Sequence, residues 1–164
     1  MIKPAQMKEE AIKLEDENYE FRTFLKIHAD EEELDKQFHS LHKELFENYD
    51  CSKCRNCCRE FEVVLEKGEI EAIAGFLHIS RESFISDFTK ENHGEHQLNE
   101  IPCRFLNADN TCQIESCKPR GCVEYPNTDK PGRLWSLLGI IASASVCPVV
   151  CEILQRLKLQ YKYK

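Results

Sequence analysis

The first 21 residues contain no apolar stretch of the length that an export signal requires, and acidic side chains are scattered through them. Without such a signal we expect the protein to be cytoplasmic, where thiols stay reduced. This expectation matters because the 164-residue chain holds ten cysteines. A disulfide framework, which is typical of small secreted domains, is therefore a weaker interpretation of these cysteines than metal ligation or redox chemistry.

A basic surface is also lacking. The chain carries 22 lysines and arginines against 29 acidic residues, a formal net charge of −7. Residues 1–50 alone hold 14 acidic and 7 basic side chains. Because binding to phosphate backbones depends on clustered positive charge, nucleic acid is a poor candidate for a partner.

The chain has one long uncharged run, residues 134–151, which just reaches the lower length of a membrane span. Serine, glycine and proline interrupt this run, and it carries two cysteines. We therefore expect a buried stretch and no membrane segment.

Two motifs of enzymes that use a methyl donor are missing, a G-x-G phosphate loop and a C-x3-C-x2-C signature. The sequence therefore gives no support for an enzyme of that class.

Four cysteines lie within eight positions, in the run CSKCRNCC: Cys51, Cys54, Cys57 and Cys58. Two thiolates separated by two residues can bind one metal ion from a tight turn. Six basic residues lie between or beside the cysteines, where cations lower the pKa of thiols and offset the charge of a thiolate centre: Lys53, Arg55, Arg59, Arg104, Lys118 and Arg120. The pattern therefore predicts a metal site.

Hydrophobic periodicity predicts an α-rich, small metal-stapled domain with short β segments. Apolar residues recur at helical spacing over residues 9–26, and Asp30 followed by three glutamates is typical of a capped second helix that leads to Cys51. We expect these two helices to form an acidic hairpin, residues 1–48. The cysteine-cluster metal-binding domain, residues 49–164, should form one compact unit with it.

Shorter elements are expected within the cysteine-cluster domain. The sequence predicts a strand over residues 61–65, a helix over 66–77 and another helix capped by Ser80. Residues 92–99 and 118–132 are expected to be loops, and residues 103–112 two short arms around a polar turn. A last helix should have Pro148 in its first turn and present Cys147 and Cys151 on one face.

The runs CSKCRNCC, PCRFL and TCQIESCKPRGCVEYP together resemble the YkgJ-type cysteine cluster family, a zinc- or iron-chelating domain marked by C-x2-C-x2-C-C. The resemblance covers residues 48–155. Cys103, Cys112 and Cys122 match the family pattern, although Pro102 precedes its cysteine where the family has proline after it, and Cys117 is an additional thiol. The resemblance implies metal chelation and carries no established reaction.

The vicinal pair Cys57–Cys58 predicts how the thiols divide. Neighbouring side chains point in different directions, so one ion is not expected to take both. We therefore expect two four-thiolate centres: Cys51, Cys54 and Cys57 with Cys147 or else Cys151, and Cys58 with Cys103, Cys112 and Cys122. Cys117 has no assigned place.

The identity of the metal stays open at this point. The C-x2-C-x2-C rhythm with a remote Cys147-Pro148 is typical of bacterial ferredoxins, but it suits tetrahedral zinc equally. We expect mononuclear zinc or iron, with an iron-sulfur redox protein as the alternative. Two further classes are an enzyme, since the cluster also resembles a portion of flagellin lysine methylases, and an adaptor that docks a protein partner through its acidic N-terminal helices.

Overall fold

The computed structural model describes all 164 residues and divides into two compact units. The helical unit consists of Met1–Cys54 and Pro126–Lys164, and the central unit of Arg55–Tyr125. The sequence predicts a boundary between residues 48 and 49 within one compact unit. In the structure the C-terminal helices pack on the N-terminal helices, and the units meet after Cys54 and after Tyr125.

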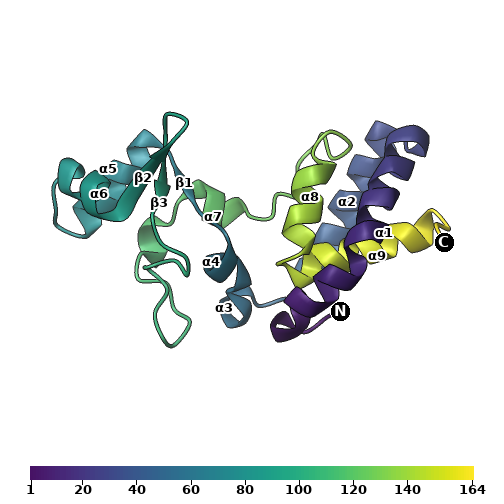
Figure 1. Cartoon of the computed structure of the whole chain (residues 1–164), viewed down its shortest axis with the longest axis horizontal. Helices are drawn as coiled ribbons and strands as arrows, with labels where there is room; N and C mark the ends of the chain where they lie inside the picture. The colour runs from purple at the N-terminus through teal and green to yellow at the C-terminus, as the bar shows by residue number, and fades with distance from the viewer. The chain divides into compact units, whose positions relative to one another are not determined.

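The four longer helices of the helical unit are α1 (Met7–His28), α2 (Glu31–Phe46), α8 (Leu137–Ala144) and α9 (Pro148–Gln160), after a 3-10 turn at Pro4–Gln6 (Figure 1). The predicted cap of α2 is confirmed, because Glu33 N donates to Asp30 Oδ1 at 3.0 Å. Proline begins α9 as predicted. α1 packs mainly on α8, and α2 mainly on α9, so the C-terminal helices are the main partners of the N-terminal pair.

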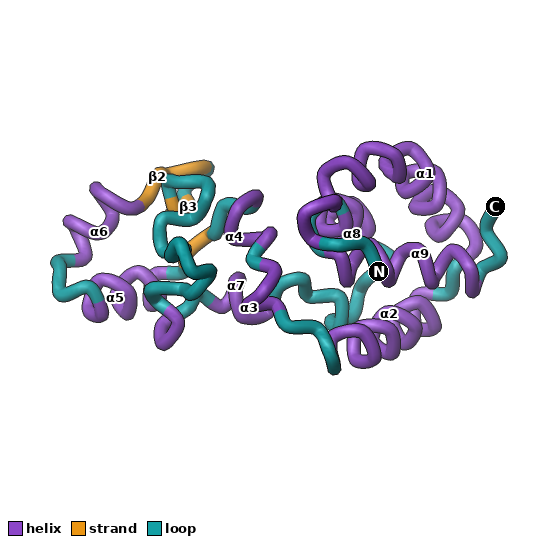
Figure 2. Tube along the Cα trace, turned by 90° about the horizontal axis from the view of Figure 1, so that it is seen from below, coloured by secondary structure: helices purple, strands orange, loops and turns teal.

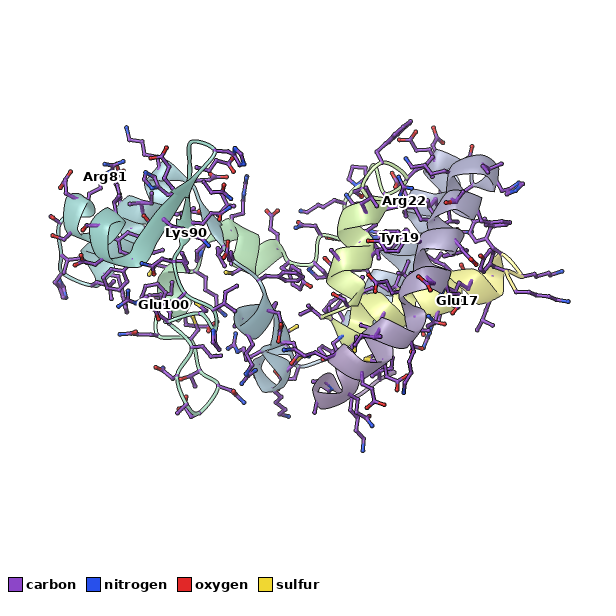
Figure 3. All side chains as sticks on the ribbon, in the orientation of Figure 1. Glu17, Tyr19, Arg22, Arg81, Lys90 and Glu100 are labelled. Atoms are coloured by element: carbon purple, nitrogen blue, oxygen red, sulfur yellow. The ribbon has the colours of Figure 1, made fainter.

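Twenty buried hydrophobic residues form the core of the helical unit, among them Phe21, Phe38, Val149 and Leu157. A lysine is buried with them: Lys158 is 3% exposed and pairs with Glu17 of α1 at 3.2 Å (Figure 3). The uncharged run of the sequence is split between α8 and α9, which meet at an angle of 120°. No single helix of the chain is long and apolar enough to cross a membrane.

The segment that leads into α8 is fixed to α2 by one carboxylate. Asp35 accepts hydrogen bonds from the backbone N–H groups of Gly132 and Arg133, each at 2.8 Å. Gly132 has a φ of 80°, a backbone conformation that favours glycine. This anchor sets where α8 begins and therefore helps to position Cys147, which follows it.

The central unit is built around a small antiparallel sheet in the order β1-β3-β2: β1 (Val64–Leu65), β2 (Thr89–Asn92) and β3 (Glu95–Leu98). Its longer helices are α5 (Lys67–Phe76) and α6 (Arg81–Phe88), shown in purple beside the orange strands in Figure 2. The predicted strand, the helix after it and the Ser80 cap are confirmed, with Ser83 N donating to Ser80 Oγ at 3.1 Å. The structure thus has the predicted α-rich class with short β segments.

Two expected loops of the central unit contain regular structure. Residues 92–99 include β3, which pairs with β2 in a hairpin. His93 and Gly94 form its tight turn, with positive φ values of 51° and 83°. Residues 118–132 include the short helix α7 (Arg120–Glu124). Its first N–H group, that of Arg120, donates to Glu69 Oε1 of α5 at 2.6 Å.

The core of the central unit is small. It consists of eight buried hydrophobic residues: Leu65, Ile70, Ile73, Ala74, Phe84, Leu98, Phe105 and Ile114. Cys103, Cys112 and Cys117 are partly buried and pack against this core. Cysteines therefore lie at the boundary of the central core, whereas Cys147 and Cys151 are fully part of the larger helical core.

Candidate metal centre

The cysteine run is broken in its middle by Arg55. This residue has a φ of 54°, in the left-handed region, and separates the short helix α3 (Cys51–Cys54) from α4 (Asn56–Glu60). The boundary between the two units lies at the same place, between Cys54 and Arg55. Two cysteines of the run therefore belong to the helical unit, and the other two to the central unit.

Three cysteines of the helical unit form what we call the helical thiol group: Cys51, Cys54 and Cys147. Cys51 and Cys54 lie one turn apart on α3, and Cys147 is buried at the N-cap of α9. Burial, above all, raises the pKa of Cys147 to about 11, and the nearby thiols of Cys51 and Cys54 raise it further. The backbone N–H groups at the start of α9 act in the opposite sense, as expected for helix N-terminal donors beside a sulfur.

Cys151 is also buried, but its surroundings differ from those of Cys147. Burial raises the pKa of Cys151, and the strongest electrostatic influences on it come from Lys158, Glu152, Glu10 and the N-terminal amine. No other thiol is among these influences. Cys147 precedes the first residue of α9, so the spacing of four residues does not bring the two thiols into one environment.

Four cysteines of the central unit form the central thiol group: Cys58, Cys103, Cys112 and Cys122. Backbone contacts join three of these segments, because Cys103 N donates to Cys58 O at 2.8 Å and Leu106 forms an isolated β-bridge with Cys112. α7 supplies Cys122, whose pKa burial raises to about 12, with further contributions from the other three thiols. Burial also raises the pKa of Cys103 and Cys112.

Cys58 differs from the rest of the central thiol group. A hydrogen bond from the Cys57 thiol is the main cause that lowers the pKa of Cys58, to about 6, and burial opposes it. Arg55, Lys118 and Arg59 lower this pKa further. The central thiol group thus contains one thiol whose pKa is lowered, beside three whose pKa values are raised.

Three of the six basic residues named in the sequence, Arg55, Arg59 and Lys118, therefore lower the pKa of a thiol. The other three have different partners. Arg55 is held in place by its Nε, which donates to Asn110 O at 3.0 Å, and Lys118 by its ion pair with Glu115 at 2.5 Å. The guanidinium of Arg104 lies 3.9 Å from the centre of the Phe88 ring, Lys53 pairs with Asp50, and Arg120 pairs with Glu66.

Two cysteines have distinct positions in the central unit. Burial raises the pKa of Cys117, and the only other influence on it is a hydrogen bond involving Ser116, so no thiol acts on it. Cys57 belongs to the central unit, and its thiol is hydrogen-bonded to that of Cys58. Its assignment to Cys51 and Cys54 stays a prediction.

The thiols present suit a thiophilic metal ion. None of the ten cysteines forms a disulfide. As the side chains stand, no group of three or more His, Cys, Asp or Glu residues is arranged to hold a metal ion. Metal binding therefore requires thiol deprotonation and a change in the positions of the thiols from the arrangement described here. The donor chemistry, all sulfur in both groups, suits zinc or iron.

One polar group near the helical thiol group escaped the sequence analysis. The sequence predicted a second helix that leads to Cys51, but α2 ends at Phe46 and Tyr49 lies in the turn that follows. Burial raises the pKa of Tyr49, and a hydrogen bond involving Cys54 raises it further. The one available signal was its position two residues before Cys51.

Comparison with protein families gives one match. The family model CxxCxxCC, described as "Putative zinc- or iron-chelating domain", matches residues 50–152. A search of curated proteins and a search of solved structures gave no significant match. The matched range contains every cysteine of the chain, which supports metal binding through these thiols in general.

Proposed function

Because the chain belongs to the CxxCxxCC family, we propose that it chelates zinc or iron in two thiolate centres, one based on the helical thiol group and one on the central thiol group. The observation that supports this most is the gathering of four cysteines from separate segments of one unit. Burial and the thiols of Cys58, Cys103 and Cys112 all raise the pKa of Cys122. Mutual influence of this kind requires the four sulfurs to lie near one another.

The central centre takes Cys58, Cys103, Cys112 and Cys122 as ligands. Four thiolates around a divalent ion carry a net charge of −2, which is costly in a partly buried position. Arg55, Arg59 and Lys118 offset this charge, since all three already lower the pKa of Cys58. Cys117 takes no part, because no other thiol is among the causes that shift its pKa.

The helical centre takes Cys51, Cys54 and Cys147, and the structure assigns no fourth protein ligand to it within the helical unit. Cys151 is a poor candidate, because its main electrostatic neighbours are Lys158, Glu152 and Glu10. Three thiolates and one further position are compatible with either zinc or iron.

The metal would act first as a structural link. In each unit it would join segments far apart in sequence: α3 with the start of α9 in one, and α4 with residues 103–122 in the other. Zinc would supply only this link, whereas iron or an iron-sulfur cluster would add electron transfer. The residues of the chain supply the anionic sulfur donors, and in the central unit Arg55, Arg59 and Lys118 balance part of their charge.

The proposal is tested by purifying the protein without oxygen and measuring metal content, inorganic sulfide and absorbance. We expect zinc or iron at two ions per chain. A colourless zinc protein would remove the redox alternatives, and a brown protein with stoichiometric sulfide would establish the iron-sulfur alternative. Protein that retains no metal under these conditions, and takes up none on reconstitution, would contradict the proposal.

A further inference from the structure

The turn at residues 107–111 connects the two segments that carry Cys103 and Cys112. Within it Asn110 N donates to Asn107 O at 3.0 Å, and Asn110 has a φ of 68°, a conformation in which asparagine is commoner than most residues. Asn110 is partly buried, whereas the other four residues of the turn are exposed. The turn therefore meets the rest of the central unit through Asn110.

Two arginines of the cysteine run hold Asn110. Arg55 Nε donates to Asn110 O at 3.0 Å, and Arg59 Nη2 donates to Asn110 Oδ1. The arginines are four positions apart, one helical turn, so both guanidinium groups reach the same residue. The Arg55 side chain is only 12% exposed, and hydrogen bonds from a charged donor are stronger than neutral ones. We call Arg55, Arg59 and their acceptor Asn110 the arginine clamp.

The base of the same segment is also attached to α4, which carries Cys58. Cys103 N donates to Cys58 O at 2.8 Å. Between the base and the turn, Leu106 forms its β-bridge with Cys112, so the two arms lie side by side. The clamp at the tip and the hydrogen bond at the base together fix the direction of both arms. The positions of the arms relative to Cys58 are therefore fixed at two points.

We propose that the arginine clamp orients segment 103–112 for metal binding by the central thiol group, which makes its members positioning residues. This inference rests on the proposed function, and it gives the two arginines a role beyond offsetting charge. Without the clamp the segment loses its attachment at the tip. Metal binding would then have to order the arms, at a cost in conformational entropy.

Positioning and charge compensation make different demands on Asn110. Positioning needs an acceptor in its side chain, because Arg59 donates to Oδ1. Compensation of thiolate charge needs only the guanidinium groups, which keep their charge whatever residue stands at position 110. Changes at Asn110 therefore separate the two roles without altering any arginine.

The test uses Cys51→Ser protein, in which only the central centre is expected to remain. Asn110→Gly tolerates the positive φ and keeps the carbonyl that accepts from Arg55, so it removes only the acceptor of Arg59. Asn110→Asp keeps a side-chain acceptor and adds a negative charge. Each protein is loaded with Zn2+ for competition against a chelator and with Co2+ for absorbance.

We expect Asn110→Gly to weaken Zn2+ affinity roughly tenfold, the lower end of the usual effect of losing a residue that orients metal ligands. Asn110→Asp should rescue most of this loss, because it restores the clamp. The cobalt d–d bands of the saturated Asn110→Gly protein should also shift, since they report how the sulfurs are arranged around the ion. A merely structural role would leave the spectrum of the saturated protein unchanged.

Asn127→Gly serves as the matched control. Asn127 also has a positive φ, 58°, and its carbonyl accepts from the guanidinium of Arg133 at 2.5 Å, but it belongs to the helical unit. This change should alter neither affinity nor spectrum. A double-mutant cycle adds Arg59→Met, whose effect on affinity should be smaller in the Asn110→Gly background because the partner is already lost.

Three results would overturn the inference. Equal Zn2+ affinity of Asn110→Gly and its parent would mean that the clamp does not act on the centre. Weaker binding by Asn110→Asp than by Asn110→Gly, or additive effects in the cycle, would leave charge as the only role of Arg59. Weaker binding with an unchanged cobalt spectrum would make the clamp merely structural. Failure of the Cys51→Ser parent itself to hold metal would instead refute the central centre of the proposed function, and the inference with it.

Discussion

Metal removal should unfold the central unit and spare the helical unit. The central unit has eight buried hydrophobic residues, against twenty in the helical unit. A core in a segment of this size rarely supplies more than about 3–5 kcal/mol. Structural zinc can contribute about 10 kcal/mol or more, so its loss exceeds what the central core can offset. The helical unit, whose long helices bury their own apolar faces, does not depend on metal to this degree.

Hydrogen exchange read by mass spectrometry resolves the two units. After treatment with a strong chelator and a reducing agent under anaerobic conditions, peptides from α5 and β3 should lose amide protection, while those from α1, α2 and α9 keep it. Adding back zinc should restore the pattern, which controls for damage. Unchanged protection in the central unit would show that metal is peripheral to its fold, and equal loss in both units would refute the reasoning from core size.

Two further outcomes follow from the thiol environments. Cys117→Ser should keep the metal content of the native protein while Cys122→Ser loses one ion, as elemental analysis would show; a larger loss from Cys117→Ser would reverse the assignment. Cys147→Ser should lose the helical centre and Cys151→Ser should not, and equal losses would place both thiols on the metal.

Local sequence signals predicted the helices well. Asp30 and Ser80 cap α2 and α6 through the expected side-chain hydrogen bonds, and Pro148 begins α9. These features depend on a few adjacent residues and on helical periodicity, both of which are visible in one sequence. The strand β3 was missed because Glu95–Leu98 is polar and lacks the alternation that marks a half-buried strand.

The arrangement of the cysteines depended on less visible causes. The break at Arg55 needs a non-glycine residue in the left-handed region, for which the sequence gives no clear signal. It places Cys51 and Cys54 in one unit and Cys57 and Cys58 in the other, although their even spacing indicated a single tight turn. Equally, Tyr49 fits the apolar period of α2, although the helix ends at Phe46 and Tyr49 lies in the turn that follows.

The central claim of two separate thiolate centres is tested most directly by metal counts and cobalt spectra of Cys51→Ser and Cys58→Ser, with Cys117→Ser as the matched control. Each of the first two should retain one of two ions, with different residual spectra, because the helical and central groups differ in ligand number and in nearby charge. The control should retain both ions. A native protein that holds a single ion, or two variants that each lose all metal, would contradict the division.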